Sequence, residues 1–224
     1  MSLPANCFGI SLTPEMHTML QDNLAAIFSS SNGDVSVPIS SILDLVKHTL
    51  PKSITCKEFD VPRLIQLARC TTPDFTIGDI FFRWHLIHCA DDQYGIYLHH
   101  ILDEDKRWPH DHPWNFISLV IEGKYDEFVF LKSAGKTPTF AKSVRTIHDG
   151  GVFRSASTAH FTEVSAEGGA WSIVLREPMS RSWGFRTEKE WVQWSEYVDS
   201  DLYTIHAGGT RRTEHNTSGV DDGE

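Results

Sequence analysis

Eight short runs with a two-residue period fill the chain between Gly78 and Leu175, and they constrain its fold most strongly. β-branched and aromatic residues dominate these runs, as they do in half-buried strands, and turn residues separate one run from the next. Many short strands with intervening turns are typical of antiparallel jelly rolls and barrels. We therefore predict a mainly β fold of this kind. The predicted strands are residues 80–87, 94–101, 116–121, 125–131, 140–147, 151–154, 160–164 and 171–175.

The N-terminal region, residues 1–75, has a helical periodicity instead. Apolar residues recur at helical spacing over about 16–28 and again over about 39–50, and a shorter run over 61–68 predicts a third helix. Such amphipathic helices bury their apolar face against a neighbouring structure. We expect residues 1–75 to cover one end of a barrel formed by residues 76–200; a separate functional module is the alternative.

The C-terminal end carries a helix signal followed by a polar tail. The sequence Thr-Glu-Lys-Glu at 187–190 matches a helix capping box and predicts a helix over 188–198 that packs Trp191 and Trp194 on the barrel. Residues 207–224 are rich in Gly, Thr, Asp and Glu and nearly lack apolar side chains. A segment that cannot bury apolar surface does not fold by itself, so we predict a disordered tail over 206–224.

Two histidines, His110 and His112, lie two residues apart at the start of an apolar run. In an extended chain, side chains two apart project from the same face, so both imidazoles can reach one metal ion. His160 begins another predicted strand, and a partner strand can bring it to the same cavity. The pattern predicts a metal site formed by these three histidines; caps or core hydrogen bonds are the structural alternative for them.

These residues resemble the cupin superfamily, whose first motif is a His-x-His strand with a Gly about eleven residues after the second His. Here that motif is His110, His112 and Gly123, and the second motif is centred on His160. The string HDHPW, with EGKYDE and SWGF after it, looks like an uncharacterised group of cupin-like proteins of bacteria and their phages. The resemblance covers about residues 78–198 and implies a cupin-type double-stranded β-helix, a jelly-roll barrel.

The chain departs from the cupin pattern at two places. The metal-binding Glu expected four residues after the second His is Phe116 here, and a phenyl ring cannot ligate a metal. Asn115, next to it, can bind weakly or hydrogen-bond a ligand. The Pro-x-Gly turn expected before the second-motif His is missing at 155–158. Because of these two departures, the cupin pattern does not identify a fourth metal ligand in this chain.

Glu127 and Arg154 are the candidate catalytic residues. A carboxylate from the strand after Gly123, Glu127 or Asp126, would complete a two-histidine, one-carboxylate arrangement with open positions on Fe(II). An inward arginine can hold a carboxylate through two parallel hydrogen bonds. Four arginines on or beside predicted strands are candidates, with surface charge as the alternative for each: Arg145, Arg154, Arg176 and Arg181.

Other side chains near the motifs have structural interpretations. Asp111 faces away from the two histidines and is expected to be structural, for example by pairing with Arg107. His99 and His100 are adjacent, so one of them can enter the interior, but a satisfied or exposed histidine is expected for both. Trp108, Trp114 and Phe116 are expected to wall the site and exclude water.

This ligand set predicts a cupin-type metal enzyme. Imidazoles with an open position suit Fe(II) best in this context, with Ni(II), Mn(II) and Zn(II) as alternatives, and such ions activate O2, polarise carbonyls or acidify water. We expect an Fe(II) dioxygenase or hydroxylase acting on a small organic or amino-acid-like substrate. The alternative is a non-catalytic cupin that binds a small molecule, a sugar or a partner protein. A metal-assisted isomerase or hydrolase is a weaker third.

Composition and charge limit the partners. The net charge of −10 disfavours nucleic acid, which usually binds a basic face. The four cysteines form no C-x-x-C pair, and neither a signal sequence nor an apolar run long enough to cross a bilayer is evident. We therefore expect reduced thiols, a cytoplasmic location and no membrane association. The cupin resemblance also makes a homodimer a candidate assembly.

Overall fold

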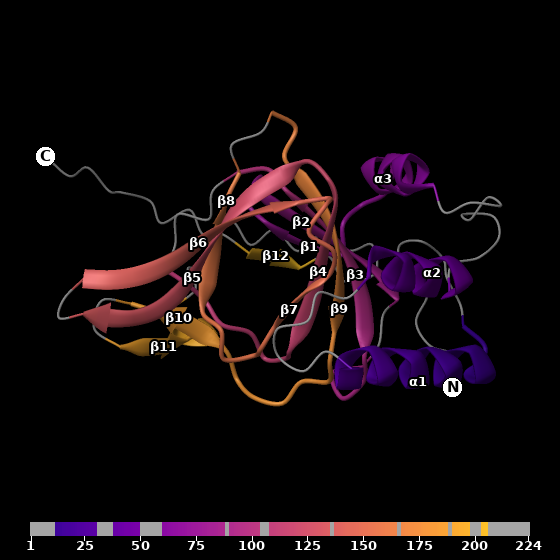
Figure 1. The fold of residues 1–224 in the computed structure, drawn as a ribbon, viewed down its shortest axis with the longest axis horizontal. Helices are drawn as coiled ribbons and strands as arrows, with labels where there is room; N and C mark the ends of the chain where they lie inside the picture. The colour runs from indigo at the N-terminus through magenta and orange to yellow at the C-terminus, as the bar shows by residue number, and fades with distance from the viewer. Residues whose placement is uncertain are drawn as a thin grey trace, which may run out of the picture.

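Two antiparallel β-sheets face each other, and helices cover the outside of the larger sheet (Figure 1). The computed structural model describes residues 12–30, 38–49, 60–87, 90–103, 108–134, 137–164, 167–187, 190–197 and 203–205. The larger sheet has the strand order β12-β1-β2-β3-β9-β4-β7, the smaller one the order β6-β5-β8, and β10 pairs with β11 as a hairpin. This is the mainly β, cupin-type architecture that the sequence predicts.

All eight predicted strands are confirmed as β2 to β9. Four additional strands, β1 and β10 to β12, are not among the predicted ones, and each of them is three residues long. The strands are β1 (Phe75–Ile77), β2 (Phe81–Ile87), β3 (Gly95–Ile101), β4 (Phe116–Glu122), β5 (Lys124–Ala134), β6 (Thr137–Thr146), β7 (Val152–Arg154), β8 (His160–Glu163), β9 (Ala170–Arg176), β10 (Gly184–Arg186), β11 (Trp191–Gln193) and β12 (Tyr203–Ile205).

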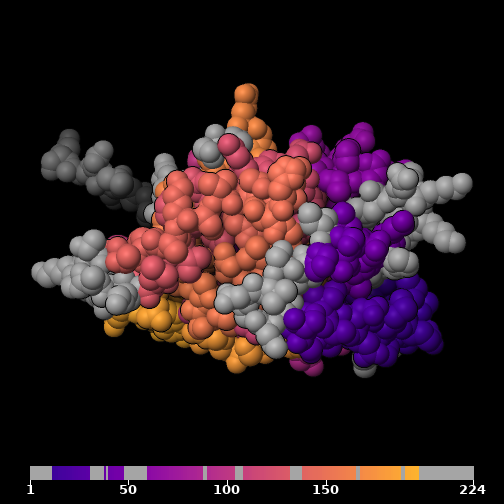
Figure 2. Space-filling view, viewed as in Figure 1, coloured from indigo at the N-terminus to yellow at the C-terminus, as the bar shows by residue number. Residues whose placement is uncertain are grey.

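The three predicted helices are also confirmed: α1 (Pro14–Ser30), α2 (Ile39–Thr49) and α3 (Val61–Arg69). They pack on the outer face of the large sheet, and Figures 1 and 2 show them gathered on one side of the molecule. Their apolar stripes, including Leu24 and Leu64, share one buried core with Leu98 and Ile173 of the sheet. None of the helices in the described ranges is long and apolar enough to cross a bilayer.

The inner faces of the two sheets form a second, more polar interior. In the strand register, Tyr97 lies opposite Val174, which in turn lies opposite Ser118. The Ser118 hydroxyl is 3.4 Å from the hydroxyl of Tyr125 on the small sheet, so the two inner faces meet there. Because side chains alternate along a strand, one set of residues packs under the helices while the other set lines the space where the predicted site lies.

The predicted helix over 188–198 is largely wrong. Thr187 and Glu190 do bond as in a capping box, since the Glu190 N–H donates to the Thr187 Oγ1 at 3.1 Å. However, the Thr187 N–H donates to the Glu190 carbonyl at 2.9 Å, so the segment closes a hairpin between β10 and β11. Only α4 (Trp194–Tyr197) is helical in the described part of this segment. The predicted tail over 206–224 lies outside the described residues.

Gly123, the glycine of the first motif, occupies a backbone position that excludes other residues. Its φ is +75°, and an added Cβ would lie 2.3 Å from the carbonyl oxygen of Gly169. Gly168 has a similar φ of +86° but open space around its Cα. We expect Gly123→Ala to lower the free energy of unfolding by about 2–3 kcal/mol and Gly168→Ala by about 1 kcal/mol. Chemical denaturation of both variants measures this difference, and equal losses would rule out the steric contribution.

Candidate metal centre

Three histidines meet in the interior between the two sheets. The ligand-capable nitrogens of His110, His112 and His160 all lie within 4.8 Å of one another. The Nε2 atoms of His112 and His160 are 2.9 Å apart, and the His110 ring is centred 5.0 Å from that of His112. Two neutral imidazole nitrogens at this distance need a proton or a cation between them. The convergence of the three residues that the sequence predicts is therefore confirmed.

The backbone of the His110 segment explains this convergence. His110 and His160 exchange two backbone hydrogen bonds of 2.9 Å, so the segment pairs with β8 although it is not itself a continuous strand. The His112 N–H donates to the Ala156 carbonyl, which fixes the next imidazole on the same side. The two motifs, about 50 residues apart in the sequence, are thus neighbours through main-chain pairing.

Asp111 holds the opposite side of this segment, as expected for a structural residue. Its carboxylate, only 1% exposed, accepts from the Gly184 N–H at 2.8 Å and from the Trp191 Nε1–H at 3.0 Å. It also pairs with Arg181 at 2.9 Å. The predicted partner Arg107 lies outside the described residues. Asp111 therefore ties the β10–β11 hairpin to the segment that carries the two histidines.

Glu127 lies behind His160 and does not join the three-histidine cluster. Its Oε1 is 2.8 Å from the His160 Nδ1, and the Arg154 guanidinium donates to both carboxylate oxygens, at 3.0 and 2.6 Å. Burial would raise the pKa of Glu127, but the hydrogen bonds and charges of His160 and Arg154 outweigh it and lower this pKa to about 2. The ionised carboxylate can only accept, so the proton of His160 lies on Nδ1 and its Nε2 faces the other histidines.

The environment of the cluster is apolar. Phe116, which replaces the expected glutamate, is centred 4.7 Å from the His112 ring and 5.7 Å from the His160 ring. Phe185 and Trp183, from the SWGF segment, lie 5.9 and 6.3 Å from the His110 ring. Burial, together with the charges of the nearby histidines and of Arg83, holds the pKa of His112 well below 6.5. A neutral imidazole is the form that binds metals.

Two of the predicted wall or ligand residues have other contacts. Trp114 packs on Tyr97 rather than on a histidine, with ring centres 6.3 Å apart. Asn115 donates to Glu177 at 2.6 Å and accepts from the Ala156 N–H at 2.7 Å, so its amide anchors the turn before His160. Trp108 is half-buried.

Surface charge was the alternative interpretation for the four candidate arginines, and the structure tests it for each. Arg145 is 3% exposed and lies 3.9 Å from Glu127, while Arg154 pairs with the same carboxylate. Arg176 is 1% exposed and donates to the Tyr97 hydroxyl and to main-chain carbonyls. Surface charge is therefore wrong for these buried arginines. Arg181, which is partly exposed, bonds Asp111 and the Ala156 carbonyl.

One interior arginine, Arg83, is not among the site residues that the sequence predicts. It lies on β2 directly opposite His99 on β3, and both face the interior. The Nε of Arg83 and the Nε2 of His99 are buried without a hydrogen-bond partner among the described residues. His99 is therefore not satisfied at this atom, contrary to the expectation. His100, on the opposite face, contacts the Gly168 carbonyl at 3.0 Å. Strand alternation within 81–87 was the signal that could have revealed Arg83.

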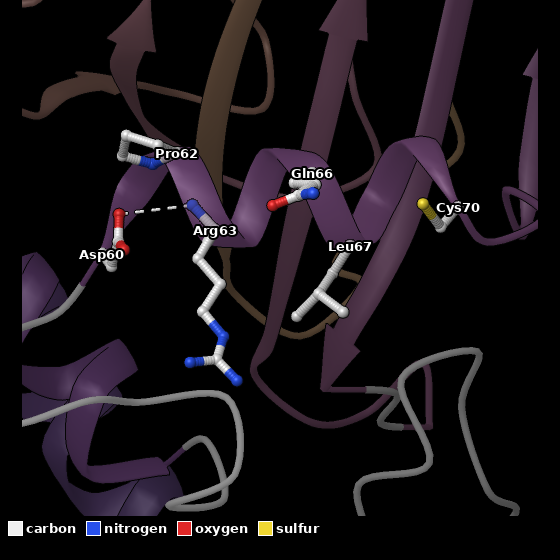
Figure 3. A pocket seen from close by; sticks show the side chains of 6 residues that line it. All are labelled: Asp60, Pro62, Arg63, Gln66, Leu67 and Cys70. Atoms are coloured by element: carbon white, nitrogen blue, oxygen red, sulfur yellow. Dashed lines mark hydrogen bonds between the residues drawn. The ribbon is translucent and has the colours of Figure 1, made fainter.

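A separate hollow of about 520 Å³ lies on α3 and shares no residue with the histidine cluster (Figure 3). Its lining side chains include the exposed Arg63 and Gln66, and the Asp60 carboxylate only caps the helix by accepting from the Arg63 N–H. It lacks the convergent titratable groups that mark a reactive site. The histidine cluster is the stronger candidate.

No protein-family model and no curated protein matches this chain. Among solved structures it is similar to an oxalate oxidase in complex with glycolate, at 15% identity and a TM-score of 0.33, over 41% of this chain and 45% of that chain. It is also similar to a cupin-2 domain protein from Rhodospirillum rubrum, at 12% identity and a TM-score of 0.39, over 52% and 70%. A vicilin from Solanum melongena matches at 11% identity and a TM-score of 0.39, over 53% and 34%.

The match thus spans less than half of the oxalate oxidase chain. Likenesses this distant do not transfer an activity, because one fold hosts many functions. The antiparallel topology and the pairing of the His110 segment with the His160 strand come from this chain itself. On these grounds the chain has the cupin fold, with histidines of both motifs gathered in its interior.

Proposed function

We propose that this protein is a metal-dependent enzyme, an Fe(II) dioxygenase or hydroxylase acting on a small organic or amino-acid-like substrate. The observation that carries the proposal is that the ligand-capable nitrogens of the three imidazoles lie within 4.8 Å of one another, beside the rings of Phe116 and Phe185. A divalent metal held there by His110, His112 and His160 would supply Lewis acidity or, as iron, redox chemistry with O2.

The surrounding residues fit such an ion. Glu127 accepts the Nδ1 proton of His160 and so directs the Nε2 lone pair toward the cluster, which is the usual support of a metal-binding histidine. Because Arg154 already binds both oxygens of Glu127, this carboxylate is better suited to orient His160 than to ligate the ion itself. The catalytic contribution we propose for Glu127 and Arg154 is therefore positional.

Phe116 stands where the cupin pattern has a metal-binding Glu, and this replacement affects the proposed chemistry. With a phenyl ring at the place of the fourth cupin ligand, three imidazoles would leave several coordination positions for a substrate and a co-substrate. The rings of Phe116 and Phe185 border the same histidines and would limit access of water. The same replacement also favours the second candidate, a non-catalytic cupin that binds a small molecule, because a vestigial site needs no fourth ligand.

Metal content is the first test. We expect the purified protein to carry about one Fe, Ni, Mn or Zn per chain and His110→Ala/His112→Ala to lose it, because one imidazole cannot hold the ion alone. His148→Ala, at an exposed turn, is the matched control and should retain the metal. Elemental analysis of the three proteins measures this, and equal or absent metal in all of them contradicts the proposal. Oxygen uptake by the loaded protein then separates redox chemistry from isomerase or hydrolase activity.

A further inference from the structure

Arg83 is a largely buried cation, and the described part of the chain gives its Nε no hydrogen-bond partner. Its guanidinium carbon lies 4.6, 5.1 and 5.8 Å from the ring centres of Phe75, Tyr97 and Phe81. Within the described ranges it makes no hydrogen bond or ion pair through its side chain, and its Nε is fully buried. Aromatic rings stabilise the charge through their faces, yet the in-plane N–H donors still require acceptors.

Another interior arginine, the structural Arg176, does have such acceptors. Arg176 packs on the same Tyr97 ring, at 5.6 Å, and its donors reach the Tyr97 hydroxyl at 2.6 Å and the Gln93 carbonyl at 2.8 Å. Burial lowers the pKa of Arg83 and the charge of the Asp74 carboxylate opposes this shift, while the Asp74 Oδ2 accepts from the His85 N–H at 2.7 Å. An enclosed donor without an acceptor costs stability, so a stabilising role does not explain Arg83.

His99 adds a second unfilled position beside Arg83. The two residues lie directly opposite each other in the β2–β3 register, and the His99 ring packs on Phe81 with centres 4.9 Å apart. Its Nε2 is buried and has no hydrogen-bond partner in the part of the chain that the structure describes. Both residues are nevertheless partly accessible to solvent, so a small polar group can reach them.

The Arg83 and His99 pair is linked to the histidine cluster by a short series of ring contacts. Tyr97, two residues before His99 and on the same face, packs in one buried group with Phe116 and Val174. Phe116 in turn contacts the rings of His112 and His160. A small molecule at the three histidines can therefore extend along this wall toward Arg83.

We propose that Arg83, assisted by His99, binds a carboxylate group of the small molecule that occupies the histidine site. The inference rests on the proposed function, and it narrows the substrate class to carboxylic acids. A guanidinium matches a carboxylate through two parallel hydrogen bonds. Burial, with the charges of Arg83 and His85, keeps the pKa of His99 well below 6.5, so the pair carries one positive charge. One charge suits a carboxylate better than a phosphate dianion.

The probe is acetate, with acetamide as a neutral molecule of the same shape, titrated by NMR at constant ionic strength. The protein should bind acetate at least tenfold more tightly than acetamide. Arg83→Met should weaken acetate binding at least tenfold, whereas Arg186→Met, at an exposed position, should not change it. The His110→Ala/His112→Ala protein should still bind acetate, which separates Arg83 from acetate binding at a metal.

The metal content and the Tm of Arg83→Met test the proposal further. Its metal content should equal that of the unmodified protein, and its Tm should be unchanged or higher, because the substitution removes an unpaired enclosed cation. Undiminished acetate binding by Arg83→Met, or a Tm lowered by several degrees, would overturn the assignment. The two proposals can fail separately. If neither the unmodified protein nor any variant holds metal, but Arg83→Met is the one variant that loses acetate binding, the proposed enzyme function fails and the carboxylate site stands.

Discussion

Replacing Arg176 by methionine is expected to lower the free energy of unfolding by about 3–5 kcal/mol, because it strips partners from several buried groups at once. The Arg176 guanidinium donates to the carbonyls of Ala90, Gln93 and Glu177 at 3.1, 2.8 and 3.2 Å. Its Nε–H donates to the Tyr97 hydroxyl at 2.6 Å. Methionine fills part of the volume but offers no donor, so these acceptors would lose their partner inside the protein.

The matched controls are two other arginines. Arg186→Met, at an exposed position on β10, should change stability by no more than about 0.5 kcal/mol. Arg83 packs against the same Tyr97 ring, but no acceptor among the described residues bonds its side chain, so Arg83→Met should not destabilise the protein. Urea denaturation of the three variants measures these differences. A loss below about 1 kcal/mol for Arg176→Met would mean that water replaces the guanidinium and that the loop at 90–93 is not anchored by it.

The strands and the three-histidine cluster could be predicted because their signals are local or depend on a fixed period. A two-residue alternation marks β2 to β9, and the same alternation puts His110 and His112 on one side. His160 could be added as the start of another predicted strand, but its pairing with His110 joins residues far apart in the chain and has no local signal.

The partners of the interior arginines and the structure of the C-terminal segment could not be predicted from local pattern. Arg176 and Arg83 both occupy apolar strands, and only the long-range positions of the 90–93 carbonyls make one structural and the other unpaired. At Thr187 the capping-box hydrogen bond forms, but the pairing of β11 with β10 and the bond from Trp191 to Asp111 outweigh the local helix preference. Tertiary contacts of this kind override propensity.

Glu127→Gln is expected to weaken metal binding about 10–100-fold and to destabilise the protein by about 3–5 kcal/mol. The metal effect follows from His160, because a neutral amide holds the Nδ1 proton less firmly than a carboxylate does and leaves the ring orientation less fixed. The stability effect follows from Arg154 and Arg145, which would lose the only carboxylate that the described residues place beside both.

The neighbouring residue on β5 provides the control. Asp126 faces the other side of the strand and pairs with Lys142 at 2.7 Å, where the lysine side chain is 52% exposed. Because exposed ion pairs contribute little, Asp126→Asn should cost less than about 1 kcal/mol and leave metal affinity unchanged. Metal titration and urea denaturation of both variants decide between two roles for Glu127. If Glu127→Gln loses stability but binds metal as tightly as before, the carboxylate serves only the arginines, and His160 is oriented by its backbone pairing with His110.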